Sequence, residues 1–160
     1  MSWKPGTHHY EVEVTWTGNT GEGTGSYKGF ERAHDVTAGG KAPIAGSADP
    51  AFRGVADRWN PEEMLVAAVS QCHMLWYLHL CVGAGIVVTA YTDRPRGTMV
   101  ENADASGAFS EVVLRPRMTI TDPGRAEEAV KLHERAHEMC FIANSVAFPI
   151  RHEPEVVTPG

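Results

Sequence analysis

The sequence contains little cysteine: only Cys72, Cys81 and Cys140 occur among its 160 residues. Three is too few, and the wrong parity, for the disulfide scaffold of a small secreted protein. The chain also has no basic excess, because its formal net charge at pH 7 is -6. Nucleic acids and anionic membranes require a basic surface, so we expect neither as a partner.

Two sequence signals of targeting and nucleotide binding are also absent. The first ten residues contain no apolar run typical of a signal peptide, so we expect a cytoplasmic protein. Gly21, Gly23 and Gly25 match neither a dinucleotide fingerprint nor a P-loop, and no Gly-Lys-Ser/Thr follows them. We interpret these glycines as part of a turn, and we expect no cofactor.

The composition indicates one globular domain spanning residues 1–160. Hydrophobic residues make up 42% of the chain and charged residues 21%, which is typical of a folded protein. The order of the expected elements predicts an α+β fold with two main helices packed on antiparallel sheet. We expect strands at 10–17, 27–36, 86–100, 109–120 and 146–157, and helices at 60–85 and 122–139.

An irregular segment and a proline also stand out in the sequence. Residues 37–59 show no sustained periodicity, and irregular segments of that length tend to line functional sites. Pro116 interrupts the strand expected at 109–120 and predicts that this strand lies at a sheet edge.

The helix expected at 60–85 is the central element of the chain. Asn60 can cap its first turn, Pro61 suits the first helical position, and Glu63 can complete a capping box. Gly85 can end it in the left-handed conformation. Its apolar residues surround the whole axis, which predicts a buried core helix, and the polar residues that interrupt it make it a poor membrane span.

The motif His133-Glu134-x-x-His137 matches the zinc-binding helix of zincin proteases. A catalytic zinc requires a third protein ligand, and neither a metzincin-type continuation nor a well-placed third histidine follows. We therefore favour an ordinary helix with two histidines on its inner face, and we expect no metal site.

Cys72 lies in the middle of the apolar helix, where a thiol is usually inert. To act as a nucleophile it needs a cation, and Arg53 and Arg58 are the nearest candidates ahead of the helix. An arginine in such a place needs a carboxylate to hold it, for which Glu62 is the natural choice. However, ten helical residues from Glu62 to Cys72 rise about 15 Å. Unless a kink or the loop closes this gap, Glu62 serves the Cys72 of a second subunit, which predicts a twofold dimer.

The run Asn60-Pro61-Glu62-Glu63-Met64-Leu65, followed by Cys72 and by a distant Cys140, resembles the OsmC/Ohr family of organic hydroperoxide reductases, and in particular its OsmC-like branch. The resemblance implies an intertwined α+β homodimer with paired long helices at its centre. It also implies a cysteine peroxidase without metal or haem, which takes organic hydroperoxides or hydrogen peroxide as substrates and an external dithiol as reductant.

The resemblance assigns a role to each site residue. Cys72 would be the peroxidatic thiolate that becomes a sulfenic acid, and Cys140 the resolving thiol that forms a disulfide with it. Arg53 would stabilise the thiolate and polarise the peroxide, while Glu62 would orient Arg53.

Some alternatives remain open from the sequence alone. Arg58 and Arg32 are further choices for the activating arginine, and Cys81 is expected to be buried and inert. Phe141 follows Cys140 where the family commonly has proline, so the helix could stop or restart there. A different function is a catalytically idle OsmC-like protein that binds a small apolar ligand in the same pocket.

Overall fold

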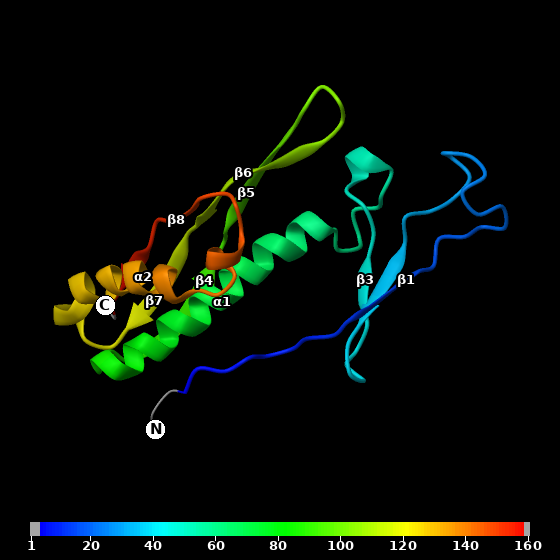
Figure 1. Ribbon diagram of the computed structural model, residues 1–160. Helices are drawn as coiled ribbons and strands as arrows, with labels where there is room; N and C mark the ends of the chain where they lie inside the picture. Colours follow the sequence, from blue (N-terminus) through cyan, green and yellow to red (C-terminus); the bar gives the residue numbers. More distant parts are fainter. Residues whose placement is uncertain (1–3, 159–160) are drawn as a thin grey trace. The chain divides into compact units, whose positions relative to one another are not determined.

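The computed structural model describes residues 4–158 (Figure 1). Residues 1–3 and 159–160, which include the two ends of the expected single domain 1–160, lie outside the described residues. The chain divides into two compact units, Met1–Glu63 and Met64–Gly160, and each is described by itself. The single domain stays a prediction.

The first unit is built around a three-stranded antiparallel sheet. Its strands are β1 (Glu13–Trp16), β2 (His34–Thr37) and β3 (Ile44–Gly46), in the order β1-β2-β3 (Figure 1). Two of the strands are much shorter than the sequence pattern predicts. The segment 37–59 is not irregular throughout, because it contains β3 and the short 3-10 helix η1 (Pro50–Phe52).

Helix α1 (Pro61–Ala84) has nearly the predicted bounds, because local signals fix both of its ends. The Glu63 N–H donates to Asn60 Oδ1 at 2.8 Å, and the Asn60 N–H donates to Glu63 Oε1 at 3.1 Å, which is the predicted capping box. Gly85 follows with φ +70°, a conformation that costs glycine little.

One face of α1 is buried within the chain. Val69, His73, Tyr77 and Cys81 recur every fourth residue and therefore lie along this face. On other faces, Leu75 is 62% exposed and Val82 81% exposed. By length and composition alone α1 could also cross a membrane, as core helices of soluble proteins often could, and this is weak evidence for a membrane protein.

The second unit adds six strands, one further helix and two short 3-10 helices to α1. Two three-stranded sheets have the orders β4-β7-β9 and β5-β6-β8. The elements are β4 (Val88–Asp93), β5 (Arg96–Glu101), β6 (Gly107–Leu114), β7 (Pro116–Ile120), η2 (Pro123–Arg125), α2 (Ala126–Met139), η3 (Ala143–Ser145), β8 (Ile150–His152) and β9 (Glu155–Val157).

Each of the three long strands predicted for this unit is in fact two strands. Pro95 separates β4 from β5 and cannot donate to a ladder, so the chain changes sheet there. The prediction that Pro116 marks an edge strand was wrong, since β7 is the central strand of its sheet. The proline is tolerated because it is the first residue of β7. Moreover, β8 and β9 pair in parallel with β6 and β7, so these two sheets are mixed.

Helix α2 and sheet β4-β7-β9 form the main core with α1. The inward residues of α2 are Ala129, His133 and Ala136, all fully buried. The Tyr77 hydroxyl of α1 donates to the Ala129 carbonyl at 2.8 Å, which ties the two helices together. The α+β class with two main helices is therefore confirmed.

Candidate active site

The structure brings together the two cysteines that the sequence singles out. Cys72 lies in the middle of α1 and is partly buried, while Cys140 directly follows α2 and is fully buried. Both are free thiols, and they lie close enough that Cys72 acts on the titration of Cys140. Burial, together with the neighbouring Cys72, raises the pKa of Cys140 to about 11. Cys140 therefore stays protonated near neutral pH.

The end of α2 places Cys140. The helix stops at Met139, and Cys140 has extended backbone angles with φ -67° and ψ 112°. Its thiol thus lies at the negative end of the helix dipole, which disfavours a thiolate. The Ala143 N–H donates to Cys140 Sγ at 3.4 Å and holds the sulfur in place.

An apolar surface adjoins the two thiols in sequence and in space. Trp76 is one helical turn after Cys72, and Phe141 directly follows Cys140. The two rings meet edge to face, with centroids 5.4 Å apart and planes at 80°. Because Phe141 is 57% exposed, this surface is open to an apolar molecule.

Arg53 has an unusual backbone in the first unit. It follows η1 with φ 68° and ψ 21°, and within residues 4–158 only Ala105 shares a positive φ among non-glycine residues. Such a conformation costs of order 1 kcal/mol and often marks a functional position. Its guanidinium carbon lies 5.6 Å from the Tyr27 ring centroid, and its side chain makes no hydrogen bond or ion pair with another described residue.

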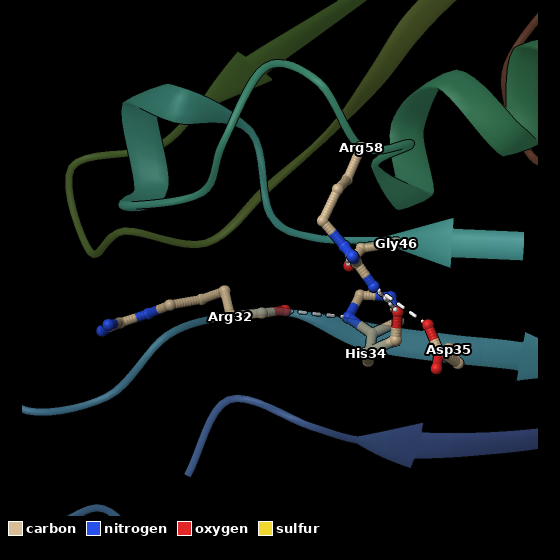
Figure 2. A network of polar contacts seen from close by, with 5 residues as sticks. All are labelled: Arg32, His34, Asp35, Gly46 and Arg58. Atoms are coloured by element: carbon tan, nitrogen blue, oxygen red, sulfur yellow. Dashed lines mark hydrogen bonds and ion pairs between the residues drawn. The ribbon is translucent and has the colours of Figure 1, made fainter. Parts of the chain in front are cut away.

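Arg58 instead serves the first unit's sheet (Figure 2). Its Nε donates to the Gly46 carbonyl at 2.8 Å, and its Nη2 donates to the His34 carbonyl and to Asp35 Oδ1, both at 2.9 Å. These bonds join β2 to β3 and occupy its guanidinium.

Arg32 is also engaged, and its side chain points away from this network in Figure 2. Its guanidinium lies 3.8 Å from the Phe30 ring centroid and donates to the Phe30 carbonyl at 2.6 Å and the Tyr27 carbonyl at 2.9 Å. Of the three candidate arginines, Arg53 has the freest guanidinium.

Glu62 lines a hollow of about 270 Å³ in the first unit, together with Arg32 and His34. Its Oε2 is buried and has no hydrogen-bond partner among the residues described. This carboxylate oxygen can therefore accept a hydrogen bond from a guanidinium. Arg53 does not line the hollow. Glu62 and the arginines belong to the first unit and the two thiols to the second.

The first histidine of the zinc-like motif packs in the core. His133 is fully buried and uses both ring nitrogens: Nδ1 lies 2.9 Å from Nε2 of His73, and Nε2 lies 3.3 Å from Sδ of Met118. Within residues 4–158 no three His, Cys, Asp or Glu side chains are placed to hold a metal. Burial lowers the pKa of His73 to about 4 and that of His133 to about 3, so both imidazoles are neutral.

Sequence reasoning missed the partner of His133 in this stack. His73 lies on the buried face of α1, four residues from both Val69 and Tyr77, and this spacing could have identified it. Cys81 is buried on the same face, and burial raises the pKa of its thiol, as expected for an inert cysteine.

Comparison with known proteins identifies relatives. The model of the family described as "OsmC-like protein" matches residues 54–155. An OsmC-like protein of unknown function from Vibrio cholerae is 32% identical, with a TM-score of 0.82, and the match covers 92% of this chain and 99% of that one. No curated protein matches the sequence.

Two more distant solved structures share the fold. An organic hydroperoxide resistance protein from Elizabethkingia anophelis has 19% identity and a TM-score of 0.65, with 95% of this chain and 99% of that chain covered. The organic hydroperoxide resistance protein OhrB of Bacillus subtilis has 18% identity and a TM-score of 0.59, with 92% and 98% covered. Because the family model matches more than half of its length, the chain belongs to the family of OsmC-like proteins.

Proposed function

We propose that this protein is a thiol-dependent peroxidase that reduces organic hydroperoxides. The observation that carries the proposal is the pair of neighbouring free thiols, Cys72 and Cys140, which come from positions far apart in the sequence. A partly exposed thiol next to a buried, protonated one is the arrangement that a two-cysteine peroxidase requires.

The reaction has three balanced steps. The Cys72 thiol releases a proton, and its thiolate attacks the distal peroxide oxygen. The O–O bond breaks, Cys72 becomes a sulfenic acid, and the alkoxide takes up the released proton and leaves as the alcohol. The Cys140 thiol then condenses with this sulfenic acid, which forms the disulfide and releases water. An external dithiol reduces the disulfide, is itself oxidised to a disulfide, and restores both thiols. A reducing compartment such as the cytoplasm supplies such a reductant.

The positive group at Cys72 is Arg53 in this proposal. Its guanidinium has no other ionic partner among the residues described, and its positive φ fixes it at a special backbone position. Glu62, with its unpaired buried oxygen, would hold the guanidinium in a bidentate pair.

The site is completed by a second copy of the chain. Helix α1 is unbroken from Pro61 to Ala84, so Glu62 and Cys72 are separated by about 15 Å of helix rise. Leu75 and Val82 are exposed on the helix, which is apolar surface for a partner helix to cover. Glu62 of one subunit would then serve Cys72 of the other.

The preferred substrate is organic. The edge-to-face pair of Trp76 and Phe141 provides an apolar surface at the thiols, and apolar surface stabilises a bound alkyl or aryl group. We therefore expect cumene hydroperoxide to react faster than hydrogen peroxide.

Counting free thiols after a small excess of cumene hydroperoxide tests the chemistry. The denatured wild-type chain should show one remaining thiol, the Cys72→Ser variant should keep both of its thiols, and Cys140→Ser should stop at a sulfenic acid that dimedone traps. The matched control is Cys81→Ser, which should still lose two thiols. Unchanged thiols in the wild type would exclude the peroxidase and favour the ligand-binding alternative.

Mixing two inactive variants tests the shared site. Neither Cys72→Ser nor Glu62→Gln should be active alone, whereas dimers formed from both contain one site with an intact Cys72 and an intact Glu62. Random exchange makes half of the dimers mixed, so about a quarter of wild-type activity should return. Absence of any recovery, in samples shown to exchange subunits, would place both residues in one chain.

A further inference from the structure

A groove lies on the face of sheet β4-β7-β9 that is turned away from the core. Tyr91, Met118 and Val156 point inward and pack in the core. Side chains alternate across a strand, so their immediate neighbours point outward. These outward residues surround a hollow of about 670 Å³, and its polar lining comprises Thr92, Arg94, Arg115, Arg117, Thr119 and Glu155.

The groove concentrates positive charge in an acidic protein. Arg94 and Arg115 have no acidic partner within residues 4–158. Arg117 pairs with Glu155 at 3.6 Å, but their side chains are 64% and 68% exposed, and exposed pairs of this kind contribute little. Three guanidiniums and one carboxylate leave the groove positive, although the whole chain carries -6.

Arg115 is held at the groove by the backbone. Arg115 Nε donates to the Arg94 carbonyl at 2.7 Å, which leaves its terminal nitrogens free. The Arg115 N–H donates to Asp93 Oδ1 at 2.7 Å, and Ser70 of α1 holds the other oxygen of Asp93 at 2.6 Å. Asp93 is thus bound on the core side and does not neutralise the groove.

The dimensions of the groove limit its ligand. Two strand spacings from β4 to β9 span about 10 Å, and the four residue steps from Arg115 to Thr119 span about 13 Å. In register, Thr92 lies opposite Arg117, so a hydroxyl donor stands beside a guanidinium. This footprint suits a molecule with a few anionic oxygens, and the acidic remainder of the surface repels a long polyanion.

We infer that this groove binds a small ligand carrying two or more phosphate charges, such as a pyrophosphate or nucleoside diphosphate group. Guanidinium forks bind phosphate oxygens in pairs, and the threonine hydroxyls can donate to the oxygens that remain. The groove contains neither Cys72 nor Cys140, and the inference is independent of the proposed peroxidase reaction.

Calorimetric titration of the full-length protein with inorganic pyrophosphate tests the inference. Binding should be detectable at millimolar or lower concentration and should weaken as salt is added. The double variant Arg115→Gln with Arg117→Gln should lose about tenfold or more in affinity. Arg94→Gln should also weaken binding, and it keeps the fold because its side chain has no hydrogen bond or ion pair with a described residue.

The matched control is Arg135→Gln, which removes an equally exposed arginine from α2, where it pairs with Glu138. Its affinity should equal that of the wild type. Absence of pyrophosphate binding, or equal affinity in the groove variants and the control, would overturn the inference. Tighter binding of citrate, or of a labelled oligonucleotide, through the same arginines would overturn the choice of a small phosphate ligand.

Discussion

The buried histidine pair predicts that the fold loses stability in mild acid. His73 and His133 stack with ring centroids 5.1 Å apart, and burial lowers their pKa values from about 6.5 to about 4 and about 3. In the unfolded chain both take up protons as the pH falls below about 6.5, whereas in the folded chain they do not. The contribution of the two neutral imidazoles to the free energy of unfolding is therefore fully present above about pH 6.5. It is lost as the pH falls toward the pKa values of the histidines in the folded chain.

The size of the effect follows from these pKa values. Between about pH 7.5 and about pH 5, an imidazole that protonates only in the unfolded state lowers the free energy of unfolding by about 2 kcal/mol. The pair together gives about 4 kcal/mol, a large part of the stability of an ordinary domain. His152, whose pKa burial also lowers, should add to the loss in the same direction.

Urea unfolding followed by tryptophan fluorescence at these two pH values measures the effect. His133→Phe keeps an aromatic ring next to Tyr77, with which His133 stacks at 3.8 Å between centroids, and removes one titrating group. Between the two pH values, the free energy of unfolding of the His133→Phe variant should fall by about 2 kcal/mol less than that of the wild type. The control His79→Gln changes an exposed histidine of α1 and should leave the loss unchanged. The same pH dependence in His133→Phe as in the wild type would refute the reasoning.

Two further predictions concern stability near neutral pH. Tyr77→Phe removes the hydroxyl that donates to the Ala129 carbonyl and should lower the free energy of unfolding by about 1 to 2 kcal/mol. Tyr91→Phe, whose hydroxyl has no partner in the part of the chain described, should lower it by less than about 0.5 kcal/mol. Equal losses for the two variants in chemical denaturation would contradict the assignment. Asn60→Ala removes the acceptor of the hydrogen bond from the Glu63 N–H and should lower the free energy of unfolding by about 1 kcal/mol, whereas Asn60→Asp should retain this bond. Hydrogen exchange at the Glu63 amide provides the check, because it should become faster only in the alanine variant.

Predictions from the sequence succeeded where the determining contacts are local. The bounds of α1 were predicted because Asn60 and Glu63 are three residues apart and their hydrogen bonds form within one turn. The strand predictions failed at Pro95 and Pro116, where the chain leaves one sheet for another without a glycine-rich turn to mark the change. Parallel pairing of β8 and β9 was equally invisible, because it depends on strands about 40 residues earlier in the chain.

For the candidate site too, the sequence identified the residues and the structure showed which of them lie together. The sequence singled out Cys72, Cys140, Arg53 and Glu62, and the structure placed the two thiols near each other. It also distinguished the arginines, because Arg58 is engaged by β2 and β3.

The sequence by itself determined the apolar central helix, its caps and the choice of candidate site residues, because these depend on residue types and short spacings. Only the tertiary structure decided that Cys140 meets Cys72, that His73 meets His133, and that Arg94, Arg115 and Arg117 share one groove. These contacts join residues on separate elements. They form only when packing fixes which faces of helices and strands are buried and which meet, and no local pattern encodes that choice.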